Sequence, residues 1–490
     1  MKARFTPGTG WALAALVLCL PLVTSQASAQ KLTLTTESED AKQHFEMGMN
    51  DVDNVFFSRA AEHFAAAMEA DPELAIAHSM HAWIAPGLSL DEREQRMDSA
   101  LGDIAKASTP ELLFASAVRR WIDDDEEGAR ALFAATAGLV PDDPHVAYWH
   151  ALLVGESGSA ERIAALEDVT ERFPDLAAAF NVLAYAQWAA GDEAGARRSV
   201  ARYAELLPDH PNSHDSVADI LQFSGLFAQA VQSYERAISI DADYFDGYIG
   251  LAEARLLAGD ANGARAALDE GREHAPSDGE RAAVTRYEAN SYFFEGDGAM
   301  GLSTLKEAAA ALEATNNMGL AAFGETGRGA QAHRELAVAE ALFGSAENIP
   351  THIAKATELS AGNADNHSWA ALAYGVAGNA DAAREAVRAY DEATDGADFT
   401  QTLDGMVQLV SGRHAEAEKL LLESGLDDDW ARAFMARCQH ETGNAAEALA
   451  LERELHADHQ FNVGNFSYTL SRLTLAENGA GRVRSGLDGR

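Results

Sequence analysis

The chain has 490 residues, and its 77 Asp and Glu residues outnumber its 37 Lys and Arg residues, which gives a formal net charge of -40. This length provides for far more than one small core, and the acidic charge disfavours nucleic acid and anionic lipid as partners. Two cysteines, Cys19 and Cys438, are too few for a disulfide-stapled fold. The sequence therefore predicts a large protein that is held together by packing.

The N-terminal segment 1–29 is typical of a secretory signal peptide. Basic residues precede the apolar run 11–23, and the small residues 27–29 follow as a cleavage site. The run is short for a membrane span, and no later segment reaches the ~20 apolar residues that a transmembrane helix needs. We therefore expect export to the periplasm or the extracellular space, with cleavage near Ala29 and Gln30 and no membrane insertion.

The segments that follow read as helices, but they share a period only in part. Residues 41–74 form a predicted helical hairpin that closes at Pro72, because proline cannot continue a helix. Residues 75–140 read as further helices that keep no fixed period. Alternation of apolar and polar residues with period two is confined to short stretches such as KLTLT (31–35), so we expect no β-sheet.

The segment 141–276 is periodic. A glycine marks the turn between two helices, and a proline or an alanine closes the second helix of each unit. The turn positions are Gly191, Gly225 and Gly259, and the closing positions are Pro174, Pro208, Ala242 and Pro276, so both series recur at one constant interval. One such hairpin cannot bury its apolar face alone, so the copies must stack on one another. The period therefore predicts a helical solenoid.

The period breaks once more and then returns. Residues 313–330 lack a clean apolar face and contain four glycines, so we expect an irregular connector there. Further on, Gly378 and Gly412 are again separated by the interval of the turn glycines. The predicted organisation is a signal peptide (1–29), a first helical-repeat block (30–312), the connector (313–330), a second helical block (331–475) and a flexible tail (476–490).

The repeating unit resembles the tetratricopeptide repeat family, whose units have the same length as this interval, about 34 residues. The unit 245–276 carries the family pattern at Tyr248, Leu251, Ala252, Gly259, Ala264 and Pro276, and the unit before it at Val217, Ala218, Ala230, Tyr234 and Ala237. The resemblance implies an all-α fold, namely a right-handed α-solenoid of about twelve stacked antiparallel helix pairs. It also implies a non-enzymatic scaffold that binds a protein or peptide on its concave face.

In this family, fixed positions in the first helix of each unit face the concave groove. Carried over to this sequence, these positions are Asn181, Tyr185, Trp188, Asp215, Asp219, Gln222, Asp246, Glu253, Arg286, Asn290 and Phe293. Aromatic residues beside carboxylates suit a partner with basic side chains and an apolar anchor. The alternative is that the aromatic residues pack between repeats and the acids are merely solvated.

The chaperone-binding members of the family hold a partner's C-terminal carboxylate with Lys and Asn side chains. Here Asp215, Asp219 and Asp246 stand at the matching positions. Carboxylates would repel such a terminus, so binding of a chaperone tail is not expected.

Two other functions stay open. His78 and His81 lie three residues apart in one predicted helix, and with Met80 they could bind copper, zinc or a small ligand in the periplasm, although surface or packing roles are commoner for such pairs. The array could also be a passive spacer that self-associates. The glycines of GDGAMG (296–301) follow a helical segment instead of a strand, so we predict no enzymatic activity and no cofactor.

Overall fold

The structure is a computed structural model of the chain. It describes residues 31–457 with the exception of residues 55, 86–87, 89, 103–106, 124, 316–326, 395, 398 and 427. The predicted signal peptide (1–29) and the predicted tail (476–490) lie outside the described residues.

The described residues form 24 α-helices and one short 3₁₀ helix, and no strand occurs among them. The first eight helices are α1 (Glu39–Asp53), α2 (Phe57–Ala70), α3 (Ala75–Ile84), α4 (Leu90–Gly102), α5 (Thr109–Ile122), α6 (Glu126–Leu139), α7 (Pro144–Leu152) and α8 (Ala160–Arg172). The next eight are α9 (Ala177–Ala189), α10 (Glu193–Leu206), α11 (Pro211–Phe223), α12 (Phe227–Ile240), α13 (Phe245–Leu257), α14 (Ala261–Glu273), α15 (Asp278–Glu295) and α16 (Gly298–Thr315). The last eight are α17 (Arg328–Phe343), α18 (Ile349–Leu359), α19 (Asp365–Val376), α20 (Ala380–Thr394), α21 (Phe399–Val410), α22 (His414–Glu423), α23 (Asp429–Glu441) and α24 (Ala445–Ala457), and the 3₁₀ helix is η3 (Ala346–Asn348).

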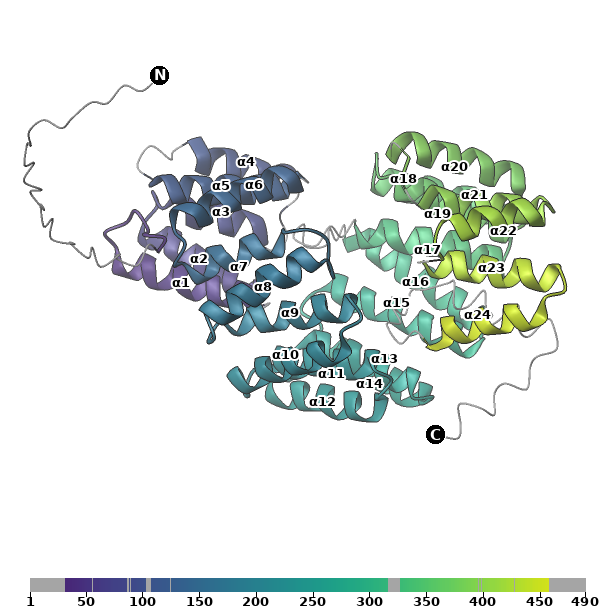
Figure 1. Ribbon diagram of the computed structural model, residues 1–490, viewed down its shortest axis with the longest axis horizontal. Coiled ribbons are helices and arrows are strands. Elements are labelled where there is room, and N and C mark those ends of the chain that lie inside the picture. The colour runs from purple at the N-terminus through teal and green to yellow at the C-terminus, as the bar shows by residue number, and fades with distance from the viewer. Residues whose placement is uncertain are drawn as a thin grey trace, which may run out of the picture.

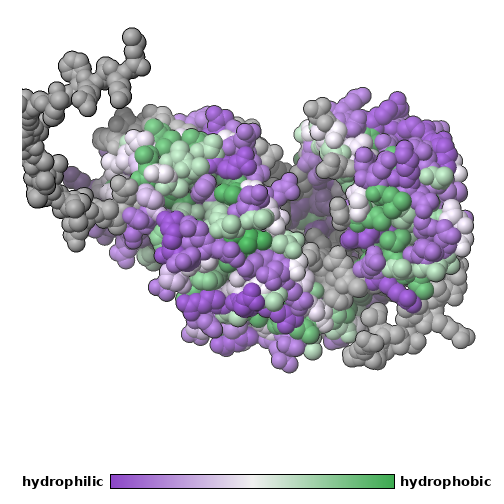
Figure 2. Space-filling model, viewed as in Figure 1, coloured by the Kyte–Doolittle hydropathy of each residue, from purple (hydrophilic) through white to green (hydrophobic). Residues whose placement is uncertain are grey.

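The helices pack as consecutive hairpins, and each hairpin packs on the next. The stack bends, so that α1–α8 and α17–α24 lie on opposite sides while α10–α14 join them below (Figure 1). The space-filling view shows a hollow between the two sides (Figure 2). The predicted all-α solenoid of about twelve helix pairs is therefore confirmed.

Glycine–aspartate turns end one helix and start the next in the periodic region. Gly191 has φ 80° and Gly259 has φ 86°, a left-handed backbone that glycine adopts without steric cost. The aspartate that follows each of them caps the next helix: Asp192 accepts the backbone N–H of Gly195 at 2.8 Å, and Asp260 accepts that of Gly263 at 2.9 Å. The regular spacing of the turn glycines thus has a geometric cause.

Small residues lie where the two helices of a hairpin approach each other. The side chains of Ala184, Ala196, Ala218, Ala230, Ala252 and Ala264 are all buried. Because alanine projects only one carbon, the helix axes can come close at these points, and larger residues fill the space beside them. Phe180, Leu183 and Val200, which the sequence assigns to that filling role, are half-buried or buried.

Helical structure reaches into both ends of the predicted connector. Helix α16 continues to Thr315 and α17 begins at Arg328, while residues 316–326 lie outside the described part. The two helices pack on each other, so the stack continues across this position. Among the described helices, none has the length and apolar composition that crossing a bilayer requires.

Candidate binding cavity

A cavity of about 470 Å³ is lined by residues of α11, α12, α13, α15 and α17. Its lining combines carboxylates, two arginines, aromatic rings and aliphatic surface. The lining residues are Asp215, Asp219, Tyr234, Phe245, Asp246, Ile249, Gly250, Glu253, Glu280, Ala283, Arg286, Tyr287, Arg328 and Gln331. First helices of four successive hairpins thus contribute to one site.

Two aspartates form the acidic end of the cavity. Asp215 and Asp219 lie four residues apart on α11, so both side chains project from the same face of the helix. Asp219 accepts hydrogen bonds from the hydroxyls of Tyr185 and Tyr234, each at 2.5 Å. Since Tyr185 belongs to α9 and Tyr234 to α12, these bonds fix the position of the carboxylate from two sides.

The surroundings of these aspartates disfavour their charge. Burial raises the pKa of Asp215 well above its usual value, and the neighbouring Asp219 and Asp246 raise it further. Burial also raises the pKa of Asp219, although the hydrogen bonds from Tyr185 and Tyr234 lower it in part. Among the described residues no lysine or arginine pairs with Asp215 or Asp219. A cation that enters the cavity would therefore relieve an unfavourable charge distribution.

The acidic end continues onto α13. Asp246 and Glu253 lie seven residues apart on this helix, so they share one face about two turns apart. Asp246 is exposed and Glu253 is half-buried. Asp215 and Asp219 on α11 are half-buried, and together the four carboxylates make this side of the cavity acidic.

The opposite wall holds two arginines that are already paired. Arg286 donates two hydrogen bonds to Glu335, at 2.8 and 2.9 Å, and Arg328 forms an ion pair with Glu280 at 2.5 Å. Such two-pronged pairing, as in Arg286, fixes the guanidinium plane and offsets its charge. The arginines therefore shape this wall, and they leave the aspartates of α11 as the uncompensated charges of the site.

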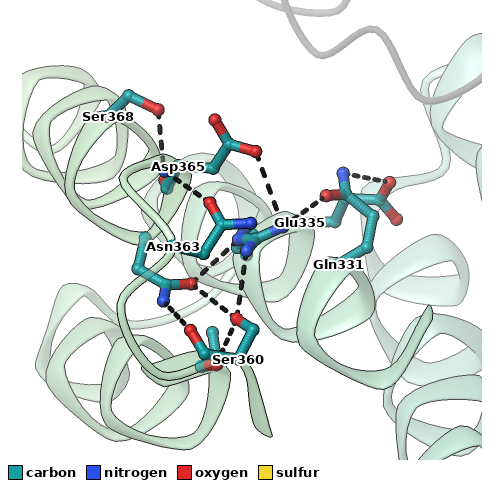
Figure 3. A network of polar contacts seen from close by, with 9 residues as sticks. Gln331, Glu335, Ser360, Asn363, Asp365 and Ser368 are labelled. Atoms are coloured by element: carbon teal, nitrogen blue, oxygen red, sulfur yellow. Dashed lines mark hydrogen bonds and ion pairs between the residues drawn. The ribbon is translucent and has the colours of Figure 1, made fainter. Parts of the chain in front are cut away.

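A polar network behind this wall holds α17 in place. Arg334 is fully buried and donates to Asn366 Oδ1 at 2.9 Å, to Ser360 Oγ at 3.1 Å and to Gln331 Oε1 at 3.2 Å. Gln331 in turn donates to Glu335 at 3.2 Å. Figure 3 shows Gln331, Glu335 and Ser360 converging on this network, which therefore links the cavity wall to the turn between α18 and α19.

The structure brings together six of the eleven groove residues that the sequence indicates. Asp215, Asp219, Asp246, Glu253 and Arg286 line the cavity, and Tyr185 supports Asp219 from α9. The four carboxylates come together because each pair shares one face of its helix, α11 or α13.

The other five groove residues lie elsewhere. Trp188 is half-buried and packs on Phe223, with ring centroids 5.6 Å apart. Phe293 is buried and stacks on Phe343, with centroids 5.2 Å apart. The remaining three, Asn181, Gln222 and Asn290, are buried within the helix packing. For Asn290 and Phe293 the cause is the length of α15, whose last two turns pack between helices instead of facing the groove.

Several cavity residues are not indicated by the sequence pattern. Tyr234 lies on a second helix of its hairpin, where the family pattern expects only packing positions. Arg328 and Gln331 start α17, directly after the break in the period, so no register connects them to α13. The apolar surface of the site comes from Phe245, Ile249 and Tyr287. Among the lining residues, the four carboxylates and Arg286 are those that the sequence pattern indicates.

The predicted histidine pair lies far from the cavity in the chain. His78 donates from Nε2 to the carbonyl oxygen of Pro72 at 3.0 Å, since a carbonyl can only accept. Burial lowers the pKa of His81, and Met80 between them is fully buried in the core. Over the described part of the chain, no group of three or more His, Cys, Asp and Glu residues is arranged to hold a metal ion.

Comparison with known proteins gives a family match. Residues 224–286 match the family model of the tetratricopeptide repeat, and no curated protein matches the chain. Similar solved structures include the thermophilic tetratricopeptide repeat protein TTC0263 of Thermus thermophilus, with 20% identity and a TM-score of 0.32 over 36% of this chain and 96% of that chain. They also include yeast Tom70, with 12% identity and a TM-score of 0.39 over 91% of this chain and 97% of that chain.

The stacked helix pairs define the class of the molecule, an α-solenoid of helical hairpins. Within that class, the family match covers α12, α13, α14 and the first half of α15, and these helices supply part of the cavity lining. The chain is a helical-repeat protein, and its residues 224–286 match the tetratricopeptide repeat.

Proposed function

We propose that the chain is a non-enzymatic scaffold that binds an extended segment of a partner protein on the concave side of α11–α17. In this proposal the acidic end of the cavity accepts a lysine or arginine side chain of the partner. The observation that carries the proposal is the half-buried pair Asp215 and Asp219, which lines the cavity without a cationic partner among the described residues.

The remaining lining supports a long basic side chain over a small inorganic cation. Phe245, Ile249 and Tyr287 offer apolar surface on which the methylene stem of a lysine or arginine can lie. Aromatic faces also attract the charged head of such a side chain. A volume of about 470 Å³ leaves room for that side chain together with a neighbouring residue of the partner.

Export belongs to the proposal as well. It is supported by the charged, apolar and small-residue order of the segment 1–29. Fractionation of the producing cells, followed by N-terminal sequencing of the purified chain, tests it. A mature end near Gln30 in an exported fraction supports export, and an intact Met1 in the cytoplasmic fraction contradicts it.

Binding is tested with an array of short fluorescent peptides that each carry one lysine or arginine beside an aromatic residue. The strongest binder is compared with the same peptide carrying glutamine in place of the basic residue. Asp219→Asn removes one charge from the cavity and should weaken the basic peptide about tenfold, which corresponds to ~1.4 kcal/mol. Asp209→Asn is the matched control, because the side chain of Asp209 is almost fully exposed outside the cavity.

The outcomes separate a specific site from general attraction to an acidic protein. The proposal requires that Asp209→Asn leave the affinity within about twofold of the unaltered chain. Equal weakening by both variants would show that net charge, and not the cavity, holds the peptide. Equal binding of the lysine and glutamine peptides would remove the basis of the proposal.

A further inference from the structure

A short segment before α1 lies across the starts of α5 and α7, and we call its residues 31–36 the N-terminal strap. Leu32, Leu34 and Thr36 are half-buried, whereas the residues between them are exposed. This alternation is that of an extended chain, whose side chains point to opposite sides in turn. Both leucines pack against the buried core of α1–α9. The strap therefore presents one face to the solenoid and the other to solvent.

Two carboxylates bind the backbone of the strap. The N–H of Leu32 donates to Asp143 Oδ2 at 3.1 Å, and the N–H of Thr35 donates to Glu111 Oε1 at 2.7 Å. Asp143 precedes α7 and Glu111 lies in the first turn of α5, and both are far from the strap in the chain. Because these contacts use main-chain groups, they can be made to any extended segment that has N–H groups at these two places.

The same carboxylates also begin their own helices. Asp143 Oδ1 accepts the N–H of Val146 at 2.9 Å, and Glu111 Oε2 accepts the N–H of Ser108 at 2.8 Å. These are the capping contacts that satisfy the free donors of a helix start. One oxygen of each carboxylate is thus used by its own helix, and the other oxygen accepts from the strap backbone.

Hydroxyl groups hold the C-terminal end of the strap. The hydroxyl of Thr35 donates to Glu111, and the hydroxyl of Thr36 donates to Asp71 in the turn between α2 and α3. Asp71 also uses its other oxygen locally, since Oδ1 accepts the N–H of Glu73 at 3.0 Å. The strap is therefore held by backbone contacts, two apolar side chains and two hydroxyls in succession.

The spacing of the contacts suits an extended chain. Three residues separate Leu32 from Thr35, and an extended chain covers about 10 Å over three residues. Packed helices lie roughly 8–10 Å apart, and α5 and α7 are in contact, with the ring centroids of Phe114 and Trp149 separated by 5.6 Å. An extended segment can therefore reach from one carboxylate to the other without a bend.

We propose that the starts of α5 and α7, with the turn before α3, form a second peptide-binding site whose ligand is an extended segment of the pattern Leu-x-Leu-Thr-Thr. The strap is a tethered ligand that fills this site, and a partner segment of the same pattern binds by displacing it. Because the strap is joined closely to α1, its effective concentration is of the order of mM. The site is separate from the acidic cavity and does not depend on the basic ligand proposed for it.

The test releases the strap in the full chain with the double substitution Leu32→Ser and Leu34→Ser, which removes its apolar contacts. A fluorescent peptide of the strap sequence, KLTLTTE (31–37), is then titrated against both forms of the chain. The released variant should bind the peptide at least about tenfold more tightly than the unaltered chain, in which the strap competes. Equal binding to both forms, or no binding to the released variant, would overturn the proposal.

A further substitution in the released variant locates the bound peptide. Asp143→Asn keeps the oxygen that caps α7, because asparagine caps helices as well as aspartate does. It places an amide N–H₂ opposite the peptide N–H, so the affinity should fall about tenfold. Asp192→Asn is the matched control, since Asp192 is exposed and caps α10 by accepting the N–H of Gly195 at 2.8 Å. Equal effects of the two substitutions would contradict the site.

Hydrogen exchange in the unaltered chain covers the case in which the serine substitutions unfold the protein. The N–H groups of Leu32 and Thr35 should be protected, and an excess of the peptide should speed their exchange because it displaces the strap. Mass spectrometry of the fragment that contains the strap measures this. Exchange that is unprotected from the start, or that excess peptide leaves unchanged, would also overturn the proposal.

Discussion

The segments 75–140 and 141–276 are both helical, but they are held together in different ways. In 141–276, glycines with positive φ and aspartate caps set the turns, and buried alanines set the helix spacing. In 75–140, large aromatic rings fill the core instead: Phe114 packs on Phe133 with centroids 5.2 Å apart, and Trp83 packs on Trp149 of the following helix α7 at 5.0 Å. The hairpins of the periodic segment are thus spaced by small residues at fixed positions. The helices of the aperiodic segment are held together by the packing of large aromatic side chains.

A buried arginine replaces the turn glycine at one point of the irregular segment. Arg93 of α4 is almost fully buried and donates to the carbonyl oxygens of Ala82 and Ala85, both at 2.9 Å. These carbonyls lie at the C-terminal end of α3, where a helix leaves its last acceptors unpaired. A long side chain can therefore satisfy the last carbonyl oxygens of a helix where no glycine turn follows it.

The largest expected effect comes from the ring that joins the two segments. Trp149 of α7 is almost fully buried and contacts Trp83, Trp121 and both phenylalanines of the cluster. Trp149→Ala should lower the free energy of unfolding by about 3–5 kcal/mol, because it leaves a large cavity. Urea denaturation measures the change. Trp188→Ala, at a half-buried ring in the periodic segment, should cost clearly less; an equal or greater loss there would contradict the contrast.

Replacing a glycine by alanine should change the stability of the chain in opposite directions in the two segments, by a smaller amount than Trp149→Ala. Gly259 has φ 86° and no heavy atom near an added Cβ, so Gly259→Ala tests the backbone alone and should cost about 1–2 kcal/mol. Gly138 is an exposed helical residue of α6 with equally open space. Gly138→Ala should stabilise the chain by about 0.5–1 kcal/mol. Thermal unfolding of both variants decides the matter, since changes of the same sign would contradict the assigned roles.

The weakest expected effect depends on pH. The folded chain raises the pKa of Asp215 above 3.8 through burial and neighbouring acids, so the folded state binds the proton more tightly than the unfolded state. The stability that this proton provides is complete below about pH 3.8 and is lost as the pH rises through the folded pKa. Asp215→Asn cannot ionise, so its unfolding midpoint should exceed that of the unaltered chain by a margin that grows from acidic to neutral pH. Asp209→Asn, with its exposed side chain, should show no such trend.

Much of the fold could be predicted from the sequence because its causes are local. Glycine turns, aspartate caps and helix-ending prolines act within a few residues, so their regular period indicates the hairpin and its repetition. Acidic positions such as Asp215 and Asp219 could be placed on one face for the same reason.

What could not be predicted depends on contacts between distant segments. Arg328 lines the cavity because α16 and α17 pack on each other across the break in the period. No local sequence pattern predicts this packing of α16 on α17. Phe293 leaves the groove because α15 is longer than the first helices of the units before it. The contact between His44 and His63 could not be predicted either, because it forms only when α1 packs on α2, and each residue alone is an ordinary helical histidine.

Photo-crosslinking tests the acidic cavity as a binding site most directly. The basic peptide selected from the array carries a photoreactive group beside its lysine, and the crosslinked residues are identified by mass spectrometry. We predict crosslinks to α13 and to the middle of α15, around Phe245, Ile249 and Tyr287, and their loss in Asp219→Asn. Crosslinks confined to the outer surfaces of α12 and α14, or unchanged in that variant, would contradict the assignment.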